Sequence, residues 1–77
     1  MSLRKQWREF DRGAVGAAPD RYGVYELGDA EGTSLGYGVG VLRDELKEEL
    51  AYGDAAKVRW VAAESREHAE RLADEAF

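Results

Sequence analysis

The stretch that decides the fold reads Tyr22-Gly23-Val24-Tyr25-Glu26-Leu27, then a turn, then Ser34-Leu35-Gly36-Tyr37-Gly38-Val39-Gly40-Val41. Aromatic and β-branched residues fill both segments, so they predict two β-strands. The intervening residues 28–33 include two glycines, which can take positive φ, and therefore predict a hairpin turn. Gly36, Gly38 and Gly40 occupy alternate positions and leave one face of the second strand almost without side chains. We expect a helix, a partner chain or a ligand to pack closely on that face.

A helix, a strand and a second helix are expected after the hairpin. Leucines recur every four residues along 42–50 among charged residues, and Gly53 follows, so this segment predicts a helix that ends there. Lys57–Ala63 predicts a third strand, and Ser65 is a suitable N-cap for a final helix. The expected buried face of the final helix consists of Ala69, Leu72, Ala73 and Ala76.

Residues 1–16 predict a further helix at the N-terminus. Its apolar stripe, at helical spacing, consists of Leu3, Trp7, Phe10 and Ala14. Basic residues lie between the apolar ones: Arg4, Lys5, Arg8 and Arg12. A solvated helix face accounts for these charges, and a binding face is the alternative.

Together these elements predict an α+β fold with the order α-β-β-α-β-α, in a single domain over residues 1–77. The third strand most simply joins the hairpin in a three-stranded, mainly antiparallel sheet, and helices cover at least one face of this sheet. A connector with Pro19 separates the N-terminal helix from the core at 19–77, because the residue before proline disfavours helical conformation.

The composition is acidic, with 16 Asp and Glu against 11 Lys and Arg, a net charge of −5 and no cysteine. The absence of cysteine excludes a disulfide framework and a thiolate metal site. The acidic balance with few lysines suggests a proteome adapted to high salt, and an ordinary acidic mesophilic domain is the alternative. It also argues against nucleic acid as the main partner, because phosphate contacts need clustered Lys and Arg. No apolar run approaches the roughly 20 residues that cross a bilayer, so we expect a cytoplasmic protein without membrane association.

With this spacing and element order, Gly23-Val24-Tyr25 and Gly36-Tyr37-Gly38 resemble the paired motifs of the GIY-YIG nuclease superfamily. The resemblance covers residues 19–77. It includes the proline before the first motif, the Asp-Ala-Glu-Gly-Thr turn at 29–33 and the Leu-Arg-x-x-Leu run that opens the following helix. It implies a GIY-YIG-like fold and, for an active member, metal-dependent hydrolysis of a phosphodiester bond.

Most of the active-site positions that the resemblance implies are not matched. Tyr25 matches the tyrosine of the first motif, whereas Tyr37 is displaced by one position, which turns its hydroxyl to the opposite face of the sheet. Glu45 stands at the position of the family's catalytic arginine, and Arg43 lies two residues earlier. A carboxylate there opposes the stabilisation of a phosphoryl charge. We therefore expect no catalysis, with Tyr25, Tyr37 and Arg43 as vestigial site residues.

No metal site is expected. Ala73 stands where the family has its metal-binding glutamate, although Glu70 or Asp74 would serve in a shifted register. His68 is the sole histidine, and a half-exposed helix residue beside Glu64 accounts for it better than a weak metal ligand does. A further group of carboxylates is expected to form a solvated acidic face rather than a cation site: Glu45, Glu48, Glu49 and Asp54. Mg²⁺ belongs only to the nuclease alternative, and no other cofactor is expected.

Three functional hypotheses remain. The first is a non-catalytic GIY-YIG-like module for protein interaction, most simply a homodimer, because so small a core gains stability from a partner. Its candidate interface residues are Trp7, Gly36, Gly38, Gly40 and Trp60. The alternative is a nucleic-acid-binding or residual endonuclease domain that uses Arg4, Arg8 and Arg12. The third, a small ligand beside the glycine-bearing strand, has no specific polar signature.

Overall fold

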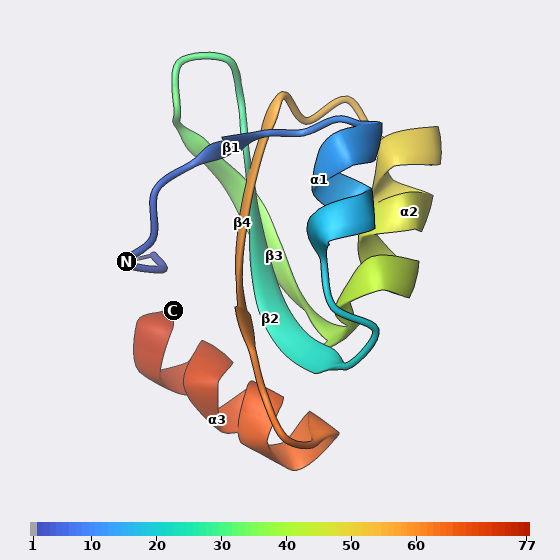
Figure 1. Ribbon diagram of the computed structural model, residues 1–77. Coiled ribbons are helices and arrows are strands. Elements are labelled where there is room, and N and C mark those ends of the chain that lie inside the picture. Colours follow the sequence, from blue (N-terminus) through green and yellow to red (C-terminus); the bar gives the residue numbers. More distant parts are fainter. Residues whose placement is uncertain (1) are drawn as a thin grey trace.

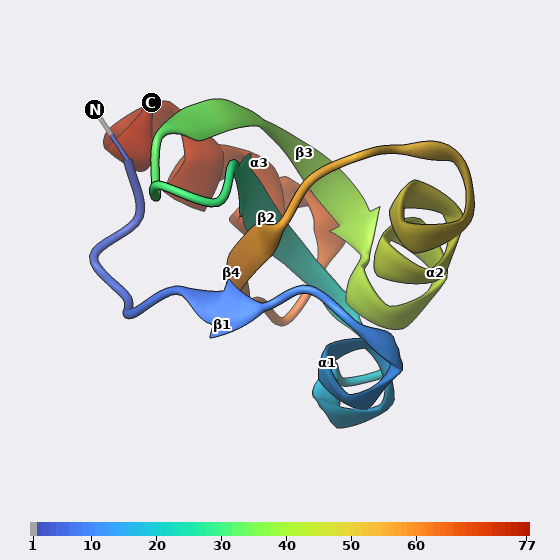
Figure 2. The same ribbon diagram turned by 90° about the horizontal axis from the view of Figure 1, so that it is seen from above.

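The computed structural model describes residues 2–77 as an α+β fold with three helices and a four-stranded antiparallel sheet (Figure 1). In chain order the elements are β1 (Arg8–Glu9), α1 (Arg12–Ala17), β2 (Tyr22–Gly28), β3 (Ser34–Val41), α2 (Leu42–Tyr52), β4 (Lys57–Ala62) and α3 (Arg66–Ala76). Across the sheet the strands are ordered β1-β4-β2-β3. The helices α1 and α2 lie on one side of the sheet and α3 lies on the other, so the fold has three layers (Figures 1 and 2).

The hairpin of β2 and β3 forms as the sequence predicts. Tyr25 of β2 pairs with Gly38 of β3 in an antiparallel register. In the turn, Asp29 Oδ1 accepts a hydrogen bond of 2.9 Å from the backbone N–H of Thr33. Gly32 has a φ of +83°, a conformation that glycine adopts without steric cost. Local hydrogen bonds and one glycine thus set the geometry of the turn.

The larger core lies between the sheet and the helices α1 and α2. Leu42 and Leu46 of α2 and Val58 of β4 are fully buried in it. Gly23 lets α2 approach the sheet, because a Cβ at this position would lie 2.6 Å from Leu42 Cδ1. The predicted helix after the hairpin is confirmed, and Gly53 is its C-cap.

The smaller core lies between the opposite face of the sheet and α3. Ser65 is the N-cap of α3, as predicted, and its Oγ accepts a hydrogen bond of 3.1 Å from the backbone N–H of His68. Ala69 and Ala73 of the predicted apolar face are buried, and the other two residues of that face are half-buried. Ala73 packs in this core with Val24 of β2, where a small side chain lets the helix lie close to the sheet.

The predicted helix over residues 1–16 is wrong. Residues 2–11 are not helical: the chain bends at residues 4–5 and then forms β1, and the first helix comprises Arg12–Ala17. Asp11 starts this helix, because its Oδ1 accepts a hydrogen bond of 2.9 Å from the backbone N–H of Ala14. Met1 lies outside the described residues.

Residues 2–11 are not helical because their apolar side chains pack in both cores, on opposite faces of the sheet. Leu3 is buried in the smaller core on one face of the sheet, and Phe10 is buried in the larger core on the other face. One face of a single helix cannot reach both, whereas an extended segment crosses the sheet edge between them. On the way Arg8 pairs with Val58, so the sheet has a fourth strand instead of the predicted three.

Candidate functional site

At Gly38 and Gly40 the glycine-bearing face of β3 is filled by other side chains of the same chain. Tyr25, which is 5% exposed, lies so close to Gly38 that a Cβ there would collide with the phenol oxygen. At Gly40 a Cβ would lie 2.7 Å from Glu45 Cγ of α2. The close packing that the sequence predicts is present at both glycines. The groups that pack there are Tyr25 of the neighbouring strand β2 and Glu45 of α2. This face of Gly38 and Gly40 is therefore covered by the chain's own side chains and is not open to a partner.

Tyr25 and Glu45 form a closed pair beneath α2. The Tyr25 hydroxyl donates a hydrogen bond of 3.0 Å to Glu45 Oε1. Burial raises the pKa of Tyr25 well above its ordinary value, and the hydrogen bond to Glu45 and the negative charges of Glu45, Glu49 and Glu48 raise it further. The phenol thus stays protonated at neutral pH. The carboxylates around it repel a phosphate group.

The other two predicted site residues, Arg43 and Tyr37, lie apart from Tyr25. Arg43 of α2 uses its Nε to donate a hydrogen bond of 3.0 Å to the backbone carbonyl of Ala18, which ties α2 to the segment after α1. Tyr37 neighbours Gly38 in β3 and therefore faces the opposite side of the sheet from Tyr25. There its ring stacks on Phe77 with 4.0 Å between the centroids. The structure does not bring these three residues together.

The outer edge of β3 is open at its first half. β3 is a terminal strand of the sheet, and its residues 34–37 are exposed. Leu35 is 54% exposed and Tyr37 is 52% exposed. Gly36 has a φ of +144°, and no atom lies within 4 Å of the point where its Cβ would stand. Of the three predicted interface glycines, Gly36 alone faces open space.

Glu26 and Arg59 fasten the N-terminal segment to the sheet. Glu26 is fully buried, and its Oε1 accepts hydrogen bonds from Arg59 Nε at 2.8 Å and from the backbone N–H of Leu3 at 3.0 Å. Arg59 Nη1 donates a second hydrogen bond of 2.9 Å, to the backbone carbonyl of Lys5. Burial by itself raises the pKa of Glu26, but the Arg59 guanidinium and the Leu3 N–H outweigh it and hold the pKa below its ordinary value.

A cavity of about 650 Å³ lies between the N-terminal segment and the outer edge of β4, and we call it the strand-edge pocket. The Arg59 guanidinium lies 3.8 Å from the centroid of Trp7, and the Arg8 guanidinium lies 4.3 Å from that of Trp60. Such contacts hold an arginine flat on an indole ring. The ionisable residues that line the strand-edge pocket are Lys5, Arg8 and Arg59. The predicted interface residues Trp7 and Trp60 are thus half-buried walls of one pocket.

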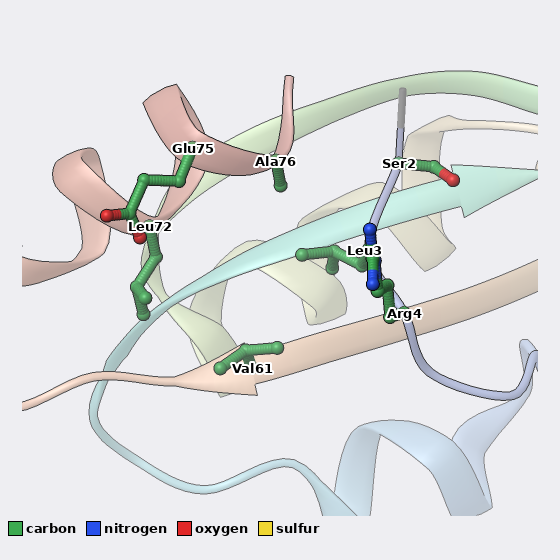
Figure 3. A pocket seen from close by; sticks show the side chains of 7 residues that line it. All are labelled: Ser2, Leu3, Arg4, Val61, Leu72, Glu75 and Ala76. Atoms are coloured by element: carbon green, nitrogen blue, oxygen red, sulfur yellow. The ribbon is translucent and has the colours of Figure 1, made fainter.

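A second, more apolar cavity of about 470 Å³ lies between the N-terminal segment, β4 and α3 (Figure 3). Its side chains come from the N-terminal segment, β4 and α3, as the figure shows. They are Ser2, Leu3, Arg4, Val61, Leu72, Glu75 and Ala76.

The three arginines of the predicted binding face lie in different places. Arg4 lines this second cavity, Arg8 lines the strand-edge pocket and Arg12 begins α1. The predicted common face of the three arginines does not exist, because the residues between them are not helical.

His68 has a structural role in the capping of α3. Its Nδ1 accepts a hydrogen bond of 3.1 Å from the backbone N–H of Glu64, while its own backbone N–H binds Ser65. Within residues 2–77, no three His, Cys, Asp or Glu side chains are grouped so that they could hold a metal ion.

Sequence reasoning missed Glu26 and Arg59, although a signal was present. Glu26 is the single charged residue of β2, and Arg59 lies within the apolar β4. The antiparallel register places the two directly opposite each other. Opposite charges at facing positions of neighbouring strands indicate a cross-strand ion pair.

These features define a small three-layer α+β domain built on a four-stranded antiparallel sheet. The chain belongs to a family described as a domain of unknown function (DUF7508), whose model matches residues 1–76. No curated protein and no solved structure matches the chain. None of the described helices has the length and apolar character that crossing a bilayer requires.

Proposed function

We propose that this protein is a non-catalytic, GIY-YIG-like interaction module that pairs with a second copy of itself through the outer edge of β3. The observation that carries the proposal is the exposed first half of β3, with Leu35 and Tyr37 on its surface. Exposed backbone N–H and C=O groups along such an edge can pair with another strand.

β3 lacks the devices by which soluble proteins protect a sheet edge. Charged side chains, proline and very short strands commonly prevent pairing between edges. β3 is eight residues long and contains neither a charged residue nor a proline. An edge of this kind supports specific pairing with another chain.

A second copy offers the matching surface. Two identical edge strands pair antiparallel about a two-fold axis, so each contributes the same residues to a closed interface. Leu35 and Tyr37 are two positions apart and point to the same face of the sheet, where Tyr37 already stacks on Phe77. Pairing would extend this apolar surface and add to a core that is small because the chain has only 77 residues.

The non-catalytic part of the proposal is supported by the Tyr25–Glu45 pair. The family resemblance assigns the tyrosine and an arginine to a phosphoryl-transfer site, but here a carboxylate accepts the hydrogen bond of the tyrosine. Incubation with single- and double-stranded DNA and Mg²⁺ or Mn²⁺ tests this part. Nicking that disappears in Tyr25→Phe would refute it.

The oligomeric state tests the interface. Sedimentation velocity at micromolar protein in molar salt is expected to show a dimer that Tyr37→Lys converts to a monomer. Tyr52→Lys is the matched control, because Tyr52 is 88% exposed on α2 and lies outside the proposed interface. A wild-type protein that stays monomeric at high concentration, or a Tyr52→Lys variant that dissociates equally, would exclude the homodimer.

A further inference from the structure

We propose that the strand-edge pocket binds an acidic peptide segment in extended conformation. The peptide pairs with residues 59–62 of β4, beyond the part that β1 covers, and Lys5 and Arg8 hold its carboxylates. This site lies at the opposite edge of the sheet from β3 and is independent of the proposed dimer interface.

The backbone of β4 provides the first requirement for such a peptide. β1 pairs with Lys57 and Val58 only, whereas β4 continues to Ala62. The remaining residues 59–62 line the strand-edge pocket, with β2 on their inner side. Since backbone groups of a strand point alternately to its two sides, half of those at 59–62 point away from β2 and can pair with an added strand.

The charge of the pocket provides the second requirement. Its ionisable lining residues are all basic, in a protein whose net charge is −5. Arg59 is already paired with the buried Glu26. Lys5 and Arg8 are exposed, and within residues 2–77 no carboxylate forms a salt bridge with either of them. These two cations are therefore available to carboxylates of a ligand.

The two indoles fix the shape of the pocket. The Arg8 guanidinium lies over the Trp60 ring, and this cation–π contact places the charge beside β4. A guanidinium group can bind a carboxylate through two parallel hydrogen bonds. Trp7 stands over Gly28, where a Cβ would lie 2.8 Å from its Cη2, so the glycine lets the indole pack against the sheet.

The pocket is also held open before a ligand arrives. At one end Glu26 binds the backbone of Leu3 and Arg59 binds the backbone of Lys5. At the other end β1 pairs with β4. A wall fixed at both ends loses little conformational freedom on binding, which favours affinity.

A set of three synthetic peptides tests the proposal. One alternates Glu with Val, the second replaces each Glu with Gln, and the third replaces each Glu with Lys. Tryptophan fluorescence and calorimetry are expected to show binding of the Glu peptide that weakens with salt, about ten-fold weaker binding of the Gln peptide and none of the Lys peptide. Slowed amide exchange at residues 59–62 in the complex would report strand addition.

Charge reversal locates the site. Arg8→Glu and Lys5→Glu are each expected to weaken binding of the Glu peptide about ten-fold or more. Arg12→Glu is the matched control, since Arg12 is an exposed arginine nearby that does not line the pocket. Equal binding of the Glu and Gln peptides, equal loss in Arg12→Glu, or binding of tripolyphosphate without binding of the Glu peptide would overturn the proposal. Circular dichroism confirms that each variant is folded.

Discussion

Replacement of Glu26 by glutamine removes the charge on which the N-terminal segment depends. The carboxylate is fully buried and accepts hydrogen bonds from Arg59 and from the backbone of Leu3. The Arg59 side chain is itself only 13% exposed, so Glu26→Gln leaves its charge poorly solvated and without a counter-ion. A glutamine oxygen in the place of Oε1 can still accept both hydrogen bonds, because both end on that oxygen. The loss therefore falls near the lower end of the cost of breaking a buried ion pair, about 3 kcal/mol.

This loss is a large part of the total stability. Typical values of 0.05–0.15 kcal/mol per residue give about 4–12 kcal/mol for a domain of this length. Urea denaturation of Glu26→Gln should show the decrease directly, and thermal unfolding should show a midpoint lower by roughly 12 °C or more.

The matched control is Glu9→Gln. Glu9 also forms an ion pair across two strands, with Lys57 Nζ at 2.6 Å, but its side chain is 73% exposed. An exposed pair contributes about 0–1 kcal/mol, so this variant should be close to the wild type. If Glu26→Gln were no less stable than Glu9→Gln, the buried ion pair would not be what fastens the N-terminal segment.

The stability difference between the wild type and Glu26→Gln depends on pH in a defined way. The pKa of Glu26 is lower in the folded than in the unfolded protein. Its contribution to stability is therefore complete above the unfolded value of about 4.3 and is lost as the pH falls through the folded pKa. The difference in unfolding free energy between wild type and Glu26→Gln should shrink in that acidic range and stay constant at neutral pH.

Two further predictions concern the larger core. Gly38→Ala should lower the free energy of unfolding in urea by about 1–3 kcal/mol, because the added methyl group meets the Tyr25 ring. Gly16→Ala is the control and should be neutral or stabilising, because a Cβ at this position of α1 meets no other atom. Equal effects would argue against close packing at Gly38. Tyr25→Phe should cost about 1 kcal/mol through the lost hydrogen bond to Glu45. Because the pKa of Tyr25 is raised on folding, this difference is present below about pH 10 and is lost at higher pH. Absorbance titration of the wild type should show one tyrosine ionising after the others, and its absence would contradict the closed pair.

Local patterns predicted the fold from residue 19 onward. Alternation in β2, the glycines of the turn, the leucine spacing of α2 and the Ser65 cap all depend on neighbours in sequence, and each prediction matches the structure. The N-terminal segment differs because its conformation depends on distant groups. Its backbone at Leu3 binds Glu26, and Phe10 donates its N–H to the carbonyl of Ala56. Apolar spacing contains no information on such contacts, so it predicted a helix.

The candidate surfaces could be predicted in part. Glycines at alternate positions predicted close packing on β3, but they could not tell that Tyr25 and Glu45 provide it. The displaced position of Tyr37 predicted that its side chain faces away from Tyr25, as the register shows. The strand-edge pocket was not predictable, because it requires Lys5 and Arg8 to lie beside β4, and only the extended path of the N-terminal segment places them there.

The two edges of the sheet differ in the physical force that each offers a partner. β3 presents apolar side chains and backbone without charge, so salt, which screens the repulsion between two acidic copies, should strengthen pairing there. β4 presents its backbone beside free cations, so salt should weaken binding there. Only the second edge depends on the N-terminal segment, and hence on Glu26. The two proposed interactions use separate edges of the sheet, and neither requires catalytic residues.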